Sequence, residues 1–168
     1  VNVLGTLNVL KSCKDLGKKL VFISTDYVFD GEKGNYTIDD PINPLSKYAK
    51  TKAAAELLVR TYENSLVIRT SFFGYEFPYE AAFVDQWSSK DYVDVIAPKV
   101  LKEVLTDRLG IVHVGSERRS IYNIAKERCL KVKKSYKNDS GIVVPVDTSL
   151  NLEKSEDVPW EYWLINEE

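Results

Sequence analysis

Helical and strand-like hydrophobic patterns alternate through the first 70 residues of the chain. Residues 1–16 carry apolar side chains at helical spacing, and Gly17 suits the C-cap that would end this helix. Residues 20–24 (LVFIS) and 66–70 (LVIRT) are short apolar runs. Such runs are typical of strands that are buried on both faces of a parallel sheet.

A further helix is predicted between these two strands, over residues 43–63. Asn43 is the expected N-cap, with Pro44 at the first helical position. The sequence AKTKAAAELLVR within this segment is rich in helix-forming residues. The order strand, polar loop, helix, strand predicts an α/β fold of doubly wound character.

The hydrophobic pattern is weaker after Gly74. We therefore expect residues 1–74 to carry the first part of the sheet, and residues 75–168 to complete it and to form a smaller, irregular lobe. The helical spacing of Trp160 and Trp163 predicts that they dock the acidic tail onto the body of the protein. Further helices are expected at residues 77–89, 98–109 and 120–132, and further strands at residues 93–97, 111–114 and 142–146.

Composition and charge narrow the classes of function. The 168 residues are 44% hydrophobic and 29% charged, as in a globular domain with a sizeable core. The net charge of −2 gives no electrostatic reason to expect nucleic acid or an anionic membrane as a partner. No apolar run approaches the roughly 20 residues of a membrane span. Cys13 and Cys129 have no metal-binding or redox spacing, so we expect free thiols, no metal and a cytoplasmic location.

Tyr48 and Lys52 are four residues apart on a predicted helix and therefore share one face. An ammonium group beside a phenol stabilises the phenolate and lowers a pKa that starts near 10. This would suit the tyrosine to act as an acid or a base near neutral pH. The pair alone is weak evidence, because Tyr122 and Lys126 repeat the spacing and are interpreted as a surface pair.

Thr25 adds context to this pair, because it leaves the carboxyl end of the first strand. Ligands bind at that edge of open α/β sheets. The Thr25 hydroxyl could hydrogen-bond a substrate carbonyl oxygen and stabilise the charge that develops there. The alternative is that Ser24 and Thr25 form an ordinary turn that satisfies local amides. Asp26 and Tyr27 extend the polar cluster and favour the first interpretation.

Several sequence blocks follow one family pattern: ISTDYVFDG at residues 23–31, YAKTK at residues 48–52, VIRTS at residues 67–71 and GIVHVG at residues 110–115. Together they resemble the extended short-chain dehydrogenases/reductases, a part of the NAD-dependent epimerase/dehydratase superfamily. The closest subgroup is the dTDP-4-dehydrorhamnose reductase type. The resemblance implies an NAD(P)-binding, Rossmann-like, doubly wound parallel sheet with a small C-terminal substrate lobe.

The resemblance also implies a role for each matching residue. Tyr48 would donate the proton, and Lys52 would hold the nicotinamide ribose and lower the pKa of the tyrosine. Thr25 would orient the keto oxygen of the sugar, and Asp26 would contact the same sugar. The remaining implied positions are Asn2 near the cofactor and the lysine, Ser71 beside the nicotinamide, and Phe72, where the subgroup often has a tryptophan packed on the sugar.

The glycine-rich phosphate loop of the family has no counterpart in this sequence. The family opens with a strand, a Gly-x-x-Gly-x-x-Gly turn and a helix whose N-terminus binds pyrophosphate. No spacing among the eight glycines makes that loop, and the chain contains no methionine. We therefore expect an N-terminally truncated fragment or a processed chain that lacks about 90 residues, or three βα units. One sheet edge would be exposed, and a second copy or another protein partner could cover it.

The resemblance implies that the parent protein uses NADP or NAD to reduce a 4-keto nucleotide-sugar. Three alternatives stay open: a nucleotide-sugar epimerase or dehydratase with the same Thr–Tyr–Lys set, a non-catalytic regulatory or binding subunit, and an inactive fragment. The isolated chain is expected to bind a dinucleotide weakly or not at all. His113 lies mid-strand between valines and is expected to be a satisfied histidine rather than a catalytic one.

Overall fold

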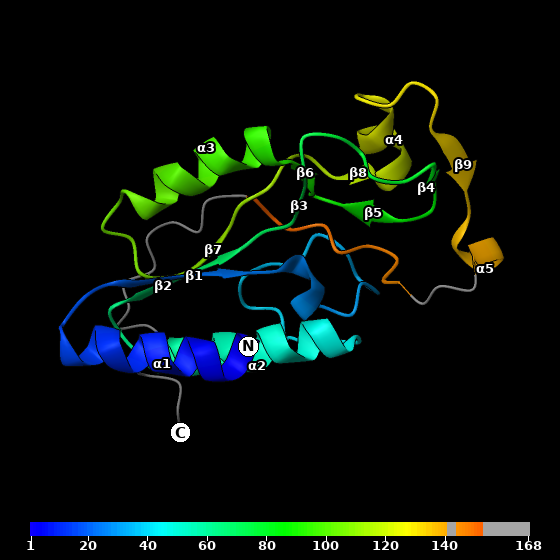
Figure 1. The fold of residues 1–168 in the computed structure, drawn as a ribbon. Helices are drawn as coiled ribbons and strands as arrows, with labels where there is room; N and C mark the ends of the chain where they lie inside the picture. The colour runs from blue at the N-terminus through cyan, green and yellow to red at the C-terminus, as the bar shows by residue number, and fades with distance from the viewer. Residues whose placement is uncertain (141–143, 153–168) are drawn as a thin grey trace.

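A three-stranded parallel sheet forms the centre of the protein in a computed structural model that describes residues 1–140 and 144–152 (Figure 1). The strands β1 (Leu20–Ser24), β2 (Ser65–Arg69) and β7 (Gly110–His113) lie in the order β1-β2-β7. Their last residues are paired in register, so all three carboxyl ends reach the same edge. Within the described residues, the outer edge of β1 has no partner strand.

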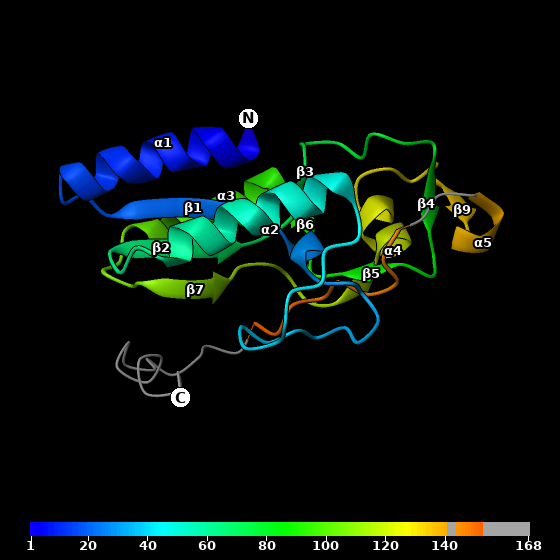
Figure 2. The same ribbon diagram turned by 90° about the horizontal axis from the view of Figure 1, so that it is seen from below.

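Helices cover both faces of this sheet. The helices α1 (Asn2–Asp15) and α2 (Lys47–Arg60) lie side by side on one face, and α3 (Val93–Val104) lies on the other (Figures 1 and 2). The end of α1 is followed by Gly17, whose φ of +61° suits glycine and confirms the predicted cap. The doubly wound arrangement predicted from the sequence is therefore confirmed.

Alternating side chains of β2 explain how the two layers of helices are held. Leu66 and Ile68 point to one face, where they pack with Ile96 of α3. Val67, between them, points to the opposite face and packs with Leu10 of α1 and Val59 of α2. Successive residues of a strand face opposite sides of the sheet, so a strand buried on both sides must be apolar throughout its centre.

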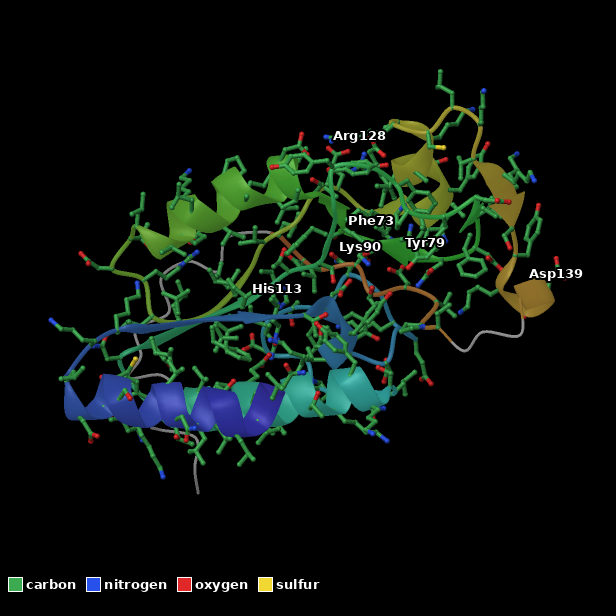
Figure 3. The ribbon with its side chains drawn as sticks, in the orientation of Figure 1. Phe73, Tyr79, Lys90, His113, Arg128 and Asp139 are labelled. Atoms are coloured by element: carbon green, nitrogen blue, oxygen red, sulfur yellow. The ribbon has the colours of Figure 1, made fainter. Side chains whose placement is uncertain are left out.

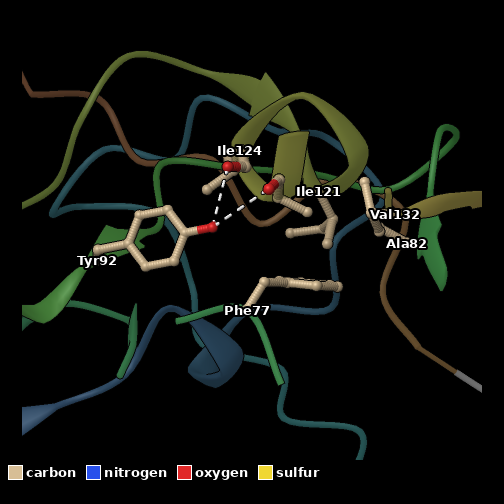
Figure 4. Close-up of a cluster of buried hydrophobic side chains, with 7 residues drawn as sticks. Phe77, Ala82, Tyr92, Ile121, Ile124 and Val132 are labelled. Atoms are coloured by element: carbon tan, nitrogen blue, oxygen red, sulfur yellow. Dashed lines mark hydrogen bonds between the residues drawn. The ribbon is translucent and has the colours of Figure 1, made fainter. Parts of the chain in front are cut away.

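A second region lies beyond the carboxyl edge of the sheet and consists of short elements. Its core packs Phe77, Ala82 and Tyr92 against Ile121 and Ile124, and the Tyr92 hydroxyl donates to the Ile124 carbonyl at 3.2 Å (Figure 4). The elements of this region are β3 (Phe72–Phe73), β4 (Ala81–Phe83), β5 (Trp87–Ser88), β6 (Asp91–Tyr92), β8 (Arg119–Ser120), α4 (Ile121–Lys126), β9 (Lys133–Ser135) and α5 (Lys137–Ser140).

Residues 144–152 return from this region toward the loop that follows β1. Leu150 bridges Tyr36, and Asp147 bridges Trp87. Leu150 also joins a buried cluster with Val28 and Phe29. Val28 is the last residue of the short 3-10 helix η1 (Asp26–Val28), and Phe29 follows it. The last described segment therefore holds the loop that carries the polar end of β1.

The predicted boundaries of the helix between the first two strands need correction. α2 begins at Lys47, not after Asn43, and the Ser46 hydroxyl caps it by accepting from the Ala49 amide at 3.1 Å. Asn43 instead donates its backbone amide to the Val28 carbonyl at 2.8 Å. The asparagine is thereby held in the preceding loop and is not available as a cap.

Two element types after Gly74 were predicted wrongly. Residues 77–89 contain β4 and β5 rather than a helix. Residues 93–97 belong to α3 rather than to a strand, and Pro98 lies inside that helix instead of opening it. Valines and isoleucine there have strand propensity, but burial of Ile96 against the sheet favours the helix.

Three further predictions have smaller corrections. The helix expected at residues 120–132 is limited to α4, with the Ser120 hydroxyl as its cap. β1 is less buried than expected, because Ile23 is 39% exposed. Residues 144–146 of the expected strand at 142–146 are not in a strand, and residues 142–143 lie outside the described residues, as do Trp160 and Trp163.

Candidate active site

The carboxyl end of β1 turns directly into η1, and this turn fixes Thr25. The Thr25 hydroxyl caps η1 by accepting from the Tyr27 amide at 3.2 Å, and it donates to an oxygen of Asp26, also at 3.2 Å. Thr25 is 4% exposed. The local turn that the sequence offered as an alternative is therefore present, at the sheet edge where ligands bind in this class of fold.

Asp26 is the centre of a buried network of hydroxyl groups. Its carboxylate accepts from Ser88 Oγ at 3.1 Å, from Thr148 Oγ1 at 2.8 Å and, in a shorter contact, from Ser71 Oγ. With Thr25, four hydroxyl groups from separate parts of the chain reach this one carboxylate. A polar group that is only 1% exposed needs hydrogen-bond partners, and these hydroxyl groups supply them.

Tyr48 lies in the first turn of α2 and is 53% exposed, so its ring is accessible to a ligand. Its pKa is raised from the ordinary value, first by partial burial of the phenol and then by the negative charge of Asp26. The positive charge of Lys90 and a hydrogen bond with Thr25 oppose this rise in pKa. The sequence predicted a lowered pKa from Lys52, whereas the direction found is upward.

Lys52 is directed at strand β1. Its ammonium group donates to the Ile23 carbonyl at 2.6 Å and lies 4.1 Å from the centre of the Phe22 ring. Burial lowers the pKa of Lys52, while the negative charge of Glu56 raises it. Lys52 therefore shares a helix face with Tyr48, as predicted, and is held by the strand that carries Thr25.

The remaining predicted residues occupy different parts of this neighbourhood. Asn2 donates its side-chain amide to Thr51 Oγ1 at 3.0 Å, which places it one residue from Lys52 along α2. Ser71 contacts Asp26, as described above. Phe72 is 49% exposed in β3 and pairs with Asp91 of β6.

Three residues near these groups were missed by the sequence analysis. Ser88 and Thr148 bond Asp26 from 62 and 122 residues away in the chain. Lys90 is the third, and its ammonium group lies over the rings of Tyr27 and Phe73. Figure 3 labels Lys90 and Phe73. No spacing signal links these positions to the Tyr48 pair, because the folded chain alone brings them together.

A buried ion pair lies beside the site and supports it. Glu56 of α2 accepts from Arg69 Nη2 at 2.7 Å and from Ser24 Oγ at 2.6 Å. Arg69 also lies 3.4 Å from the His113 ring nitrogen, whose other nitrogen lies 3.2 Å from the Asn151 carbonyl. Burial and the nearby Arg69 charge lower the pKa of His113 to about 4. His113 is thus the satisfied histidine that the sequence predicted.

Residues 1–140 and 144–152 contain neither a potential metal site nor a potential membrane span. No three His, Cys, Asp or Glu side chains gather there to hold a metal ion, and no helix there is long and apolar enough to cross a membrane. A hollow of about 290 Å³ lies between α3 and the end of β7, lined in part by Lys99, Lys102 and His113. Neither Thr25 nor Tyr48 lines it, so it is separate from the candidate site.

Comparisons with known proteins agree with this geometry. Residues 1–102 match the family described as the RmlD substrate binding domain. A dTDP-4-dehydrorhamnose reductase of Aggregatibacter actinomycetemcomitans is 35% identical over 143 residues, which cover 77% of this chain and 49% of that protein. Methionine adenosyltransferase 2 subunit beta of Xenopus tropicalis is 30% identical over 152 residues, which cover 74% of this chain and 45% of that protein.

A solved structure shares the fold closely. The crystal structure of a dTDP-4-dehydrorhamnose reductase from Bacillus anthracis, in complex with NADP, superimposes with a TM-score of 0.78 at 25% identity. The match covers 89% of this chain and 63% of that chain. The chain spans about half the length, or less, of the curated relatives that it matches.

A helix-flanked parallel sheet with polar residues gathered at its carboxyl edge defines a Rossmann-like α/β protein. The family match then makes the assignment more specific. The chain belongs to the RmlD substrate-binding domain family, within the NAD-dependent epimerase/dehydratase superfamily. The resemblance predicted from the sequence is confirmed.

Proposed function

We propose that the parent protein catalyses NAD(P)-dependent reduction of a 4-keto nucleotide-sugar. The observation that carries this proposal is the arrangement at the carboxyl end of β1, where Thr25 is held by η1, Tyr48 lies in the first turn of α2, and Lys52, one helical turn further along, donates to the Ile23 carbonyl of β1 at 2.6 Å. The names of the reductase relatives support the substrate class. These relatives are longer than this chain, so the reductase activity is proposed for the parent protein.

The residues at this edge fit a nicotinamide cofactor. Thr70, which follows β2 and precedes Ser71, has a buried hydroxyl group with no hydrogen-bond partner among the described residues. A buried hydroxyl without a partner is costly, and a polar group of a ligand would relieve that cost. We propose that Lys52, Asn2 and Ser71 hold the nicotinamide nucleoside. A reduced nicotinamide supplies the hydride when it is bound.

Tyr48 then supplies the proton. A tyrosine phenol holds its proton at neutral pH because its ordinary pKa is about 10, and the upward shift of the pKa of Tyr48 keeps that proton in place until it is transferred. The phenol O–H bond breaks as the new O–H bond forms on the sugar oxygen, and a phenolate remains on Tyr48. Thr25, which can exchange its bond to Asp26 for one to the substrate, would orient the keto oxygen.

We propose a division of labour between the two parts of the chain. Residues 1–74 would carry the residues that act on the cofactor and the proton. Residues 75–168 would complete the sheet through β7 and contribute a lobe for the sugar, with Asp26 and Phe72 at the junction. The separate core of the second region supports this division, because it lets the lobe hold its shape independently of the sheet.

The test is the turnover of the protein as its gene encodes it, measured as oxidation of NADPH by dTDP-4-dehydrorhamnose. Tyr48→Phe removes the proton donor and should lower kcat by about 100- to 10,000-fold, the range typical of general acid catalysis. Tyr122→Phe is the matched control, since Tyr122 has the same spacing to a lysine but lies in α4. Equal turnover in Tyr48→Phe and the unsubstituted protein would contradict the proposal.

A second candidate is a non-catalytic binding subunit, favoured by the match to methionine adenosyltransferase 2 subunit beta. A subunit of this kind would co-purify with a protein partner in fixed stoichiometry. Titration with NADPH separates the two candidates when it is combined with the turnover assay. A bound partner without turnover would favour the subunit, whereas turnover that depends on Tyr48 favours the reductase.

A further inference from the structure

The carboxylate of Asp26 accepts a complete set of hydrogen bonds. A carboxylate has two oxygens with about four lone-pair sites between them. Oδ1 accepts from Thr25 Oγ1 at 3.2 Å and, in a shorter contact, from Ser71 Oγ. Oδ2 accepts from Ser88 Oγ at 3.1 Å and from Thr148 Oγ1 at 2.8 Å. Each site therefore has a donor from the protein itself, and the residue is only 1% exposed.

The two oxygens of Asp26 divide these donors by their place in the fold. On the Oδ1 side, Thr25 directly follows β1 and Ser71 comes two residues after β2, so both stand at the carboxyl edge of the sheet. On the Oδ2 side, Ser88 lies in β5 of the second region, and Thr148 lies in the segment that returns from it. One buried side chain thus joins the edge of the sheet to the second region.

The contact with Thr25 is the longest of the four. The Thr25 hydroxyl also accepts from the Tyr27 amide at 3.2 Å, which keeps its oxygen in place at the start of η1. Longer hydrogen bonds are weaker. The hydrogen of Thr25 is therefore the one that a ligand can draw away from Asp26, while the other three hydroxyl groups still hold the carboxylate.

We propose that Asp26 is a positioning residue, whose carboxylate sets the place of the Thr25 hydroxyl relative to the lobe and does not itself bind the sugar. This inference rests on the proposed function. It assigns to Asp26 a different role from the sugar contact that the resemblance implies, because its lone-pair sites are already filled. Thr25 turns to the keto oxygen when the substrate arrives, and Asp26 stays where the lobe holds it.

The experiment removes the lobe-side donors and leaves Asp26 and Thr25 unchanged. Ser88→Ala deletes one donor, and Ser89→Ala is its matched control. The two serines are adjacent and 2% and 3% exposed. Ser89 bonds the backbone of Leu150, donating to its carbonyl at 3.3 Å and accepting from its amide at 3.1 Å. Each variant loses one buried hydroxyl, but only Ser88→Ala takes a donor from Asp26.

Thr148→Val deletes the other lobe-side donor at nearly constant volume. It is needed as a second variant, because Ser88 Oγ also accepts from the Lys90 amide at 3.0 Å and Ser88→Ala loses that bond too. Thr148→Ser keeps the hydroxyl group and should restore the behaviour of the unsubstituted protein. A dispersed NMR spectrum identifies the variants that fold.

The first measurement follows the Thr25 side chain without turnover. In the chain labelled with ¹³C and ¹⁵N, the three-bond couplings between the Thr25 methyl carbon and its backbone report the χ1 rotamer. We expect one rotamer in the unsubstituted chain and in Ser89→Ala. Ser88→Ala and Thr148→Val free Asp26 to rotate, so Thr25 should sample more than one rotamer. A single unchanged Thr25 rotamer in both folded variants would overturn the inference.

The second measurement is turnover of the parent protein with NADPH and dTDP-4-dehydrorhamnose. Ser88→Ala and Thr148→Val should each lower kcat by roughly 10-fold and change KM for the sugar by less than about twofold, because a catalytic group is misplaced while the sugar keeps its contacts. Ser89→Ala should keep its kcat. In a Thr25→Val background, Ser88→Ala should cause no further loss, since it acts through Thr25.

Three results of the turnover assay would overturn the proposal. They are an unchanged kcat in both lobe-side variants, a raised KM for the sugar at constant kcat, and an equal loss with and without the Thr25 hydroxyl. Failure of the proposed function is read separately, from full turnover of Tyr48→Phe. A changed Thr25 rotamer together with that result would preserve the hold of Asp26 on Thr25, but would remove its role in the reaction and so overturn the proposal.

Discussion

Replacement of Glu56 by glutamine tests the buried ion pair that underlies the site. Glu56 is fully buried and accepts from Arg69 Nη2 at 2.7 Å, from Arg69 Nε at 3.2 Å and from Ser24 Oγ at 2.6 Å. The amide of glutamine has almost the same volume as the carboxylate but carries no charge. Arg69, which is 1% exposed, would keep its charge with the Ile38 carbonyl and the His113 ring as its further polar neighbours among the described residues.

The expected cost follows from this one-sided loss of charge. Removal of one partner from a buried ion pair costs about 3–5 kcal/mol, because the other charge stays buried without compensation. For a domain of this size, each kcal/mol corresponds to about 2–4 °C in Tm. Glu56→Gln should therefore lower Tm by roughly 6–20 °C.

Thermal and urea unfolding, followed by circular dichroism, measure this change. Glu80→Gln is the control, because its carboxylate is 92% exposed and lies 3.9 Å from Lys133. An exposed pair of this kind contributes little to stability, so Tm should stay the same. The double variant Glu56→Leu/Arg69→Met removes both charges and should regain much of the loss. A Glu56→Gln protein as stable as the Glu80→Gln control would refute the reasoning.

Two further predictions concern pH and backbone geometry. Since the pKa of His113 is lowered to about 4, the folded chain holds a neutral ring where the unfolded chain takes up a proton below about pH 6.5. The free energy of unfolding should be highest above that pH and fall by up to about 3 kcal/mol toward pH 4. Urea titrations of His113→Gln should show a flatter dependence of this free energy on pH. An equally steep dependence in this variant would contradict the assignment. Gly31 has a φ of +80°, and an added Cβ would overlap Pro145. Gly31→Ala should therefore lower Tm more than Gly17→Ala, whose added Cβ meets nothing within 4 Å, and equal Tm values would contradict this.

The sequence predicts the sheet well because its strands are buried and their pattern is strong. β2 is buried along its whole length, and the predicted segment differs from the observed one by a single residue. α1, β1 and β7 were also predicted to within one or two residues, although only part of each is buried. After Gly74 the elements are short and depend on their neighbours. Ile96 shows this, because its packing against the sheet selects a helix where propensity favours a strand.

The candidate site was only partly predictable. Thr25 and Tyr48 lie in one stretch of sequence, in which Thr25 directly follows β1 and Tyr48 lies in the first turn of α2. The hydroxyl groups of Ser88 and Thr148 and the charge of Lys90 come from elsewhere in the chain, so no periodicity reveals them. The pKa of Tyr48 is raised by burial and by the charge of Asp26, and the helical spacing of Tyr48 and Lys52 shows neither of these causes. The roles assigned to the site residues remain predictions.

The bond from Thr148 to Asp26 also has a consequence for how the protein folds. It joins residues 122 positions apart, so it closes a loop that contains most of the chain. Closing so large a loop is entropically costly and slow compared with forming the local turn at Thr25. Until residue 148 arrives, Asp26 lacks one of its four hydroxyl partners. The candidate site would thus be among the last parts of the molecule to form, and its completion would report that the chain had reached its native topology.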